Sequence, residues 1–178
     1  MLRRIYHKLF QPDPLARWID RGLVVGKNLH IQDDVVIDVS HCWHIEIGDD
    51  VTLAPRVHIL AHDASTKRHL GYTRLGKVKI GNGVFVGASS IILPGVTIGD
   101  DVIIGAGSVV TRNLPDRVVA VGNPARIVAT LDEFLVRRQR EMENVPMFGR
   151  EYTLEAQPSQ SMKDEMNTKM SSGIGYLI

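Results

Sequence analysis

The sequence predicts an all-β domain that winds as a parallel β-helix, and three observations support this prediction. First, a β-branched aliphatic residue returns at every sixth position in the middle of the chain: Ile80, Val86, Ile92, Ile98, Ile104 and Val110. Second, a small or apolar residue stands four positions after each of these: Val84, Ser90, Val96, Val102, Ser108 and Leu114. Third, glycine, asparagine and aspartate cluster between the aliphatic positions, as in Gly81-Asn82-Gly83.

A period of six fits neither an α-helix, which places apolar residues every three to four positions, nor a half-buried strand, which alternates every two. Six residues hold one short strand and one turn, and three such units make a triangular coil of about 18 residues. The aliphatic side chains then point to the axis, while glycine, asparagine and aspartate turn the corners. A β-sandwich is the alternative, but its strands do not keep an unbroken six-residue step.

The same period extends toward the N-terminus with two interruptions. It is present at Val25, Ile31 and Ile37, and again at Ile47, Leu53 and Ile59. Ten residues rather than six separate Ile37 from Ile47, so residues 41–44 mark an insertion. Residues 61–79 lack the aliphatic step and predict a loop that leaves a corner, and loops on a rigid scaffold often carry function. The β-helix is therefore expected to span residues 23–129.

The two ends of the chain differ from the repeat. An amphipathic helix is predicted within residues 1–22 by the spacing of Leu2, Ile5, Tyr6, Leu9 and Phe10. We favour a cap over the open end of the β-helix, although a basic amphipathic helix can also bind a membrane surface. The segment LDEFLVRRQREMEN predicts a second helix within residues 130–148. Residues 149–178 are polar and without a period, so we expect weak order there.

Composition narrows the class of protein. The formal net charge of +1 gives no general attraction to nucleic acid. The single cysteine, Cys42, excludes an intramolecular disulfide and agrees with a reducing compartment. No apolar run approaches the roughly 18 residues of a membrane span. The first residues also lack the apolar core and cleavage site of a signal peptide. We therefore expect a soluble, cytoplasmic protein.

The repeats carry a family resemblance. Over residues 24–128 the pattern (Ile/Val/Leu)-Gly-x-x-small-x resembles that of the hexapeptide-repeat acyltransferases. From His62 to the closing GNPARIV at 122–128, the sequence is similar to the sugar O-acetyltransferases of the galactoside and maltose type. The resemblance implies a left-handed winding, which the spacing alone does not, because parallel crossovers are usually right-handed. It also implies acetyl-CoA as donor and a homotrimer whose active site spans two subunits.

Transfer of an acyl group to a hydroxyl needs a base for the hydroxyl proton. His62, at the root of the loop, matches the family's catalytic histidine, and an imidazole with a pKa of about 6.5 accepts a proton at neutral pH. The chain has no Gly-x-Ser-x-Gly elbow, and Cys42 is its only thiol. Direct transfer is therefore favoured over a covalent intermediate. Asp63 is expected to begin a turn through its own side chain.

The resemblance also implies where acetyl-CoA binds. A backbone N–H near Gly87–Ala88 would meet the oxyanion. Small residues leave room for the pantetheine arm, Thr111 and Arg112 match a Thr-Lys pair at the CoA end, and an arginine fork suits phosphate. The expected donor-binding residues are Ala88, Ala106, Thr111, Arg112 and Arg126.

For the acceptor, the insertion offers Asp38, His41 and Trp43. In the sugar acetyltransferases, acidic and amide residues of this region bind substrate hydroxyls, but here His41 and Cys42 stand where the family has acidic residues. Trp43 can stack on a sugar ring or plug the insertion. We expect a sugar or sugar-derived hydroxyl as the acceptor, and an amino sugar, which would give N-acetylation, is the alternative.

Two other classes fit the same repeat. A zinc hydratase of the carbonic anhydrase kind would use histidine pairs such as His58 with His62, or His41 with His44. Those spacings differ from that group's, so no metal is expected. A non-catalytic scaffold is the other class, and it would be favoured if acetyl-CoA failed to raise the melting temperature.

Overall fold

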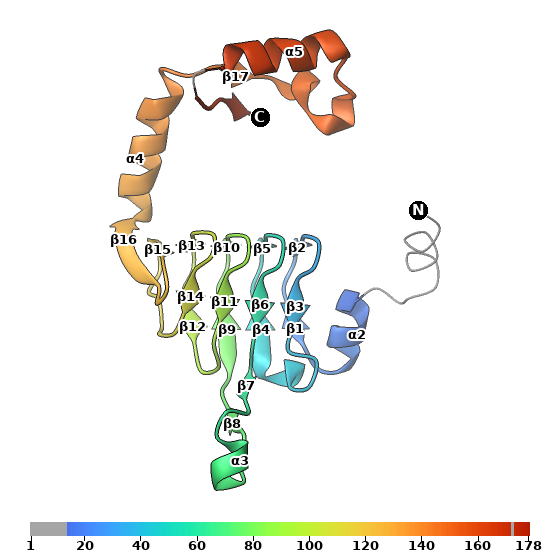
Figure 1. Ribbon diagram of the computed structural model, residues 1–178, viewed down its shortest axis with the longest axis vertical. Helices are drawn as coiled ribbons and strands as arrows, with labels where there is room; N and C mark the ends of the chain where they lie inside the picture. Colours follow the sequence, from blue (N-terminus) through green and yellow to red (C-terminus); the bar gives the residue numbers. More distant parts are fainter. Residues whose placement is uncertain (1–13, 172) are drawn as a thin grey trace. The chain divides into compact units, whose positions relative to one another are not determined.

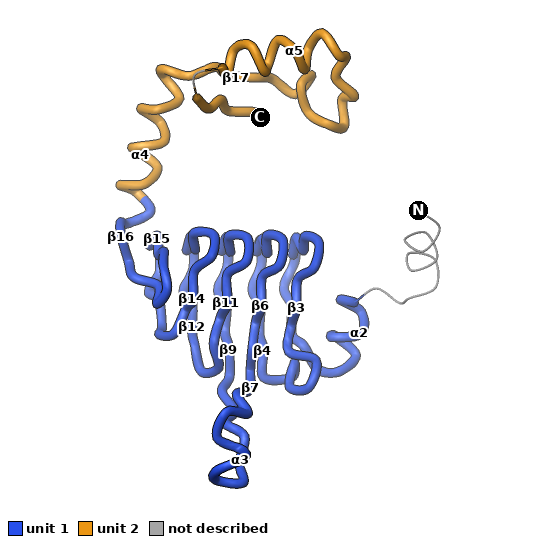
Figure 2. Tube along the Cα trace, in the orientation of Figure 1, with its two compact units in different colours: residues 1–131 blue, residues 132–178 orange. Residues whose placement is uncertain are grey.

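The computed structural model describes residues 14–171 and 173–178, and the chain divides into two compact units, residues 1–131 and 132–178 (Figure 2). The first unit contains the predicted repeats. Its strands are short, two to five residues each. The repeat strands run parallel in three sheets, and two further strands outside the repeat form a sheet of their own.

The three sheets of repeat strands are the three sides of a β-helix (Figure 1). Sheet A contains β1 (Val24–Val25), β4 (Ile45–Ile47), β9 (Val78–Ile80) and β12 (Thr97–Ile98). Sheet B contains β2 (His30–Ile31), β5 (Thr52–Leu53), β10 (Phe85–Val86), β13 (Ile103–Ile104), β15 (Val118–Val121) and β16 (Arg126–Thr130). Sheet C contains β3 (Val36–Ile37), β6 (His58–Ile59), β11 (Ile91–Ile92) and β14 (Val109–Val110). Because the chain visits A, B and C in turn, each coil from β1 to β14 adds one strand to every sheet.

The predicted six-residue positions form the core. The six aliphatics spaced six residues apart from Ile80 to Val110 are all buried, and so is the residue four positions after each, from Val84 to Leu114. Equivalent positions stack directly, as Val86 does between Leu53 and Ile104. Burial of one such side chain stabilises a fold by roughly 1.5–3 kcal/mol, so the stack of aliphatics supplies the main driving force for winding.

The corner between sheets A and B is held by a ladder of side chains. Asp49 accepts the backbone N–H of Lys27 at 2.6 Å, and Asn82 accepts that of Asp49 at 2.8 Å. Asp100 in turn accepts the N–H of Asn82 at 2.6 Å, and Asp116 that of Asp100 at 2.8 Å. This is the physical reason for asparagine and aspartate at these corners: their side chains satisfy backbone groups that the turn leaves unpaired.

Both interruptions of the repeat lie at the corner between sheets C and A. The first follows β3 and contains a 3-10 turn, η1 (Cys42–His44). The second follows β6 and forms an arm, residues 61–77, which contains β7 (His62–Asp63), α3 (Lys67–Leu70) and β8 (Arg74–Leu75). The arm projects beyond the coils, with α3 near its tip (Figure 1). The predicted insertion and loop thus stack on each other at one edge of the coil.

The two ends of the β-helix are covered differently. At the first coil, α2 (Pro14–Asp20) buries Trp18 in the core beside Leu23. The predicted helical residues from Leu2 to Phe10 lie outside the described residues. At the last coil, β16 pairs antiparallel with β15 and so ends the parallel winding.

The second unit corrects one expectation, because residues 149–178 were expected to be weakly ordered. After the predicted helix, α4 (Leu131–Met142), the chain forms β17 (Met147–Phe148), η2 (Arg150–Tyr152), η3 (Leu154–Ala156), α5 (Gln160–Lys169) and β18 (Tyr176–Leu177). Phe148 is buried against the ring of Tyr152, and Ser159 caps α5 by accepting the N–H of Met162. This packing pairs β17 with β18, which lie far apart in sequence. A local sequence period therefore does not predict it.

No helix in the described part of the chain is both long and apolar enough to cross a bilayer.

Candidate active site

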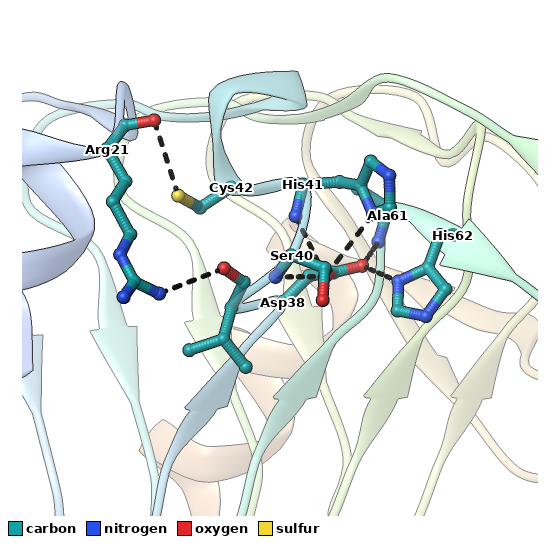
Figure 3. Close-up of polar contacts among 8 residues, drawn as sticks. Arg21, Asp38, Ser40, His41, Cys42, Ala61 and His62 are labelled. Atoms are coloured by element: carbon teal, nitrogen blue, oxygen red, sulfur yellow. Dashed lines mark hydrogen bonds and ion pairs between the residues drawn. The ribbon is translucent and has the colours of Figure 1, made fainter.

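His62 is held by a buried carboxylate (Figure 3). Its Nδ1 lies 2.5 Å from Oδ2 of Asp38. An ionised carboxylate only accepts hydrogen bonds, so Nδ1 carries the proton and Nε2 keeps its lone pair. Nε2 points away from Asp38 in Figure 3, and the His62 side chain is 33% exposed. The arrangement therefore presents an oriented imidazole whose free nitrogen can accept a proton.

Asp38 is surrounded by hydrogen-bond donors. Its Oδ1 accepts the backbone N–H groups of Ser40 at 3.0 Å and His41 at 3.1 Å, and its Oδ2 accepts that of Ala61 at 2.9 Å. Burial by itself raises the pKa of Asp38, but the hydrogen bonds from His62, Ala61 and Ser40 outweigh it and leave the pKa below its ordinary value. Asp38 is therefore ionised at neutral pH, and it stabilises a positive charge on His62.

The stacking of two coils brings Asp38 to His62. Ile37 lies opposite Ile59 in the pairing of β3 with β6, and the N–H of Asp38 continues the ladder to the carbonyl of Ile59 at 2.9 Å. Asp38 is thus the first residue after β3 at the C–A corner, and it lies in the coil next to the one from which the arm begins. From sequence, Asp38 was expected to contact the acceptor. The structure places it under His62, with its carboxylate turned to protein donors.

His41 and Trp43 extend the site along the insertion. The rings of His41 and His62 lie 4.9 Å apart, and those of His41 and Trp43 lie 5.3 Å apart. Nδ1 of His41 is buried without a hydrogen-bond partner among the described residues. Trp43 is 52% exposed, so it does not plug the insertion. Cys42 is the buried residue there, with its Sγ 3.6 Å from the carbonyl of Trp18.

Asp38, His41 and His62 are also the described residues that come nearest to a metal site, with ligand atoms within 4.8 Å of one another. Two ligands of one tetrahedral zinc ion lie about 3.3 Å apart, given metal–ligand bonds of about 2.0 Å. The 2.5 Å between Asp38 and His62 is a hydrogen-bond distance instead. His58 does not join them, because its Nδ1 lies 2.9 Å from the carbonyl of Arg56. The geometry therefore fits a hydrogen-bonded pair better than a metal centre.

The expected donor-binding residues fall at two corners. Ala88 and Ala106 lie between sheets B and C, and Arg126 opens β16 opposite Val121 at that corner. Thr111 and Arg112 follow β14 at the C–A corner, two coils beyond His62. All five are at least partly exposed.

Of the two backbone N–H groups at Gly87 and Ala88, only one is free, within the described part of the chain, to donate to an oxyanion. That of Gly87 donates to the carbonyl of Ile104 at 2.8 Å, whereas that of Ala88 has no acceptor among residues 14–171 and 173–178. Ala88 is therefore the available donor for an oxyanion. Because sheet C separates its corner from that of His62, one chain does not bring this donor and the base together.

A cavity of about 400 Å³ opens beside His62. It is lined by Leu60, His62, Asp63, Ala64, Arg74, Leu93 and Pro94. Asp63 begins a turn as predicted, because its Oδ1 accepts the N–H of Ser65 at 2.9 Å. Arg74 was not among the predicted site residues. It reaches the cavity because β7 and β8 pair antiparallel and set Arg74 opposite Asp63. No periodicity in the sequence predicts this pairing.

Comparison with known proteins agrees with this architecture. Residues 77–112 match the family model described as bacterial transferase hexapeptide (six repeats). The chain is 33% identical over 132 residues to the putative acetyltransferase YvoF of Bacillus subtilis (strain 168), a match that covers 72% of this chain and 74% of that protein. The chain belongs to the hexapeptide-repeat transferase family. This confirms the resemblance inferred from the repeats.

Two solved structures extend the comparison. A maltose O-acetyltransferase from Clostridium difficile 630 is 34% identical, with a TM-score of 0.54 over 72% of this chain and 81% of that chain. A galactoside acetyltransferase in complex with coenzyme A is 28% identical, with a TM-score of 0.54 over 72% and 78% of the two chains. These neighbours imply that the β-helix winds left-handed, as expected. The chain spans between 52% and 58% of the length of three other curated relatives.

Proposed function

We propose that the protein is an acetyltransferase that moves the acetyl group of acetyl-CoA directly to a sugar or sugar-derived hydroxyl, with His62 as general base. The observation that carries the proposal is the 2.5 Å contact between His62 and the buried, ionised Asp38, which leaves Nε2 free beside a cavity. The names of the two neighbours, a maltose O-acetyltransferase and a galactoside acetyltransferase bound to coenzyme A, support both the acceptor class and the donor.

The reaction follows from the groups present. Nε2 of His62 takes the proton of the acceptor hydroxyl as its oxygen attacks the thioester carbonyl. Asp38 stabilises the imidazolium that forms, because its carboxylate is ionised and lies on Nδ1. A backbone N–H, which we assign to Ala88, meets the oxyanion of the tetrahedral intermediate. When the intermediate collapses, the C–S bond breaks and the CoA thiolate takes the proton from the imidazolium, which restores the neutral base.

The separation of base and oxyanion donor supports a site built from two chains. His62 stands at the C–A corner and Ala88 at the B–C corner, so His62 of one copy would act on a donor lying along the B–C corner of the next. A homotrimer, in which each chain meets two neighbours, supplies this arrangement. Arg126 at that corner provides a planar fork for a phosphate of CoA, and Arg112 is a second candidate at the C–A corner.

The test is the substitution His62→Ala, assayed by thiol release from acetyl-CoA in the presence of sugar acceptors. Turnover should fall roughly 10²–10⁴-fold, the usual contribution of a general base. His30→Ala is a matched control, because His30 is exposed on sheet B and away from the C–A corner. It should keep wild-type turnover. Near-normal turnover of a folded His62→Ala protein would overturn the assignment of the base.

A further inference from the structure

The arm carries an excess of positive charge. Residues 61–77 contain four Lys or Arg residues and one Asp, a formal charge of +3. The whole chain has 21 Lys and Arg against 20 Asp and Glu, so the remainder, with 17 and 19 of these, has a formal charge of −2. The cations of the arm are all exposed: Lys67, Arg68, Arg74 and Lys77. A local field of this sign attracts anions to the arm.

The arm is an ordered segment rather than a loose basic loop. Its base is the antiparallel pairing of β7 with β8, closed by the N–H of Gly76 on the carbonyl of Ala61 at 3.0 Å. Near its tip, the hydroxyl of Thr66 donates to the carbonyl of Tyr72 at 3.0 Å. The strand β7 begins with His62 itself. The cations are therefore carried on a structured element that starts at the proposed base.

Arg74 connects the arm to the reaction site. It lines the same cavity as His62, and its side chain makes no hydrogen bond or ion pair with any other residue that the structure describes. Asp63 lies opposite it in the ladder, yet the two charged groups do not come within ion-pair distance, and Oδ1 of Asp63 already accepts the N–H of Ser65. The guanidinium therefore keeps its donors for a ligand, and its planar fork suits a carboxylate or phosphate.

We propose that the acceptor is an anionic sugar, and that Arg74 determines this specificity by binding its carboxylate or phosphate while a hydroxyl of the same sugar meets His62. This rests on the proposed function and names the substrate class of that site. The cavity of about 400 Å³ lies in the size range of small-ligand pockets and is large enough for a single sugar ring. Lys67 and Arg68 lie in α3, near the tip of the arm, and Lys77 lies at its base. All three raise the local concentration of the anion.

The experiment compares sugars that differ in one group: methyl glucuronide, methyl glucoside and glucose 1-phosphate. Binding to the full-length protein is measured by calorimetry, and acetyl transfer by thiol release. The carboxylate or the phosphate sugar should bind at least about tenfold more tightly than methyl glucoside, as expected for a charge-assisted contact. The preference should shrink as NaCl rises from about 0.05 to 0.5 M. Which anion is preferred distinguishes an acidic sugar from a phosphorylated one.

Arg74→Gln should remove the preference while leaving methyl glucoside binding and the KM for acetyl-CoA unchanged. Lys27→Gln, an exposed cation at the A–B corner, is the matched control and should change neither. The proposal is overturned if the wild type binds charged and neutral sugars equally. It is also overturned if Arg74→Gln raises the KM for acetyl-CoA instead of weakening the binding of the charged sugar. Arg74-dependent binding without any acetyl transfer would sustain this inference and reject the proposed function, so the two failures are distinguishable.

Discussion

The A–B and C–A corners of the β-helix both use aspartate side chains, but for different purposes. At the A–B corner, Asp49, Asn82 and Asp100 each accept a backbone N–H from the preceding coil, and their side chains serve the fold. At the C–A corner the repeat is interrupted in two successive coils, and the carboxylate of Asp38 meets the imidazole of His62. The carboxylates and the amide of the regular corner hold the backbone, whereas the interrupted corner sets two side chains against each other.

The largest difference between the corners should appear in activity. Asp38→Asn keeps the size of the side chain but removes the charge that stabilises the His62 imidazolium, so kcat should fall about 10²–10³-fold while KM changes little. Steady-state kinetics of thiol release measures this. Asp100→Asn is the matched substitution at the A–B corner and should leave kcat within about twofold. Equal losses from the two variants would erase the distinction between the corners.

The core between the corners should govern stability alone. Ile98 is fully buried in sheet A, and Ile98→Ala should lower the free energy of unfolding by about 2–5 kcal/mol through lost burial and the cavity left behind. Denaturant unfolding at fixed protein concentration measures the loss, since the proposed assembly would make stability concentration-dependent. The kcat per folded protein should remain that of the wild type, and a large drop in it would show that the core also positions the site.

A smaller loss of stability is expected from the ladder at the A–B corner. Asp100→Ala removes the acceptor of the Asn82 N–H, at 2.6 Å, and should cost about 0.5–1.5 kcal/mol, because water can replace the lost partner at this exposed position. The same unfolding measurement applies. A cost above that of Ile98→Ala would mean that the ladder, and not the aliphatic stack, drives winding.

The smallest effect concerns pH. The pKa of Asp38 is lowered on folding from 3.8, so its ionised form stabilises the folded state above that value, and this contribution is lost as pH falls through the lower pKa of the folded state. The stability of the wild type should therefore decline more steeply below about pH 4 than that of Asp38→Asn. Thermal unfolding between pH 7 and pH 3 tests this, and parallel curves for the two proteins would contradict it.

The sequence predicted the parts of the molecule that repeat. The stacked positions from Ile80 to Leu114, both interruptions and the position of His62 followed from a period that every coil obeys, because each coil must bury the same side chains. The contact of Asp38 with His62 was not predicted, since it depends on which coil stacks on which after an insertion of four residues. The placement of Arg74 at the cavity was not predicted either, because it depends on the pairing of β7 with β8. The order of residues 149–178 depends on contacts between β17 and β18, which lie far apart in sequence.

The central claim is that Asp38 acts through His62, and a double-mutant cycle tests it most directly. The kcat for acetyl transfer is compared among the wild type, Asp38→Asn, His62→Ala and the double variant, each confirmed to be folded. If Asp38 only positions and charges the imidazole, the double variant will be no slower than His62→Ala alone. If the two losses multiply, Asp38 contributes independently of His62, and the account of the C–A corner is wrong.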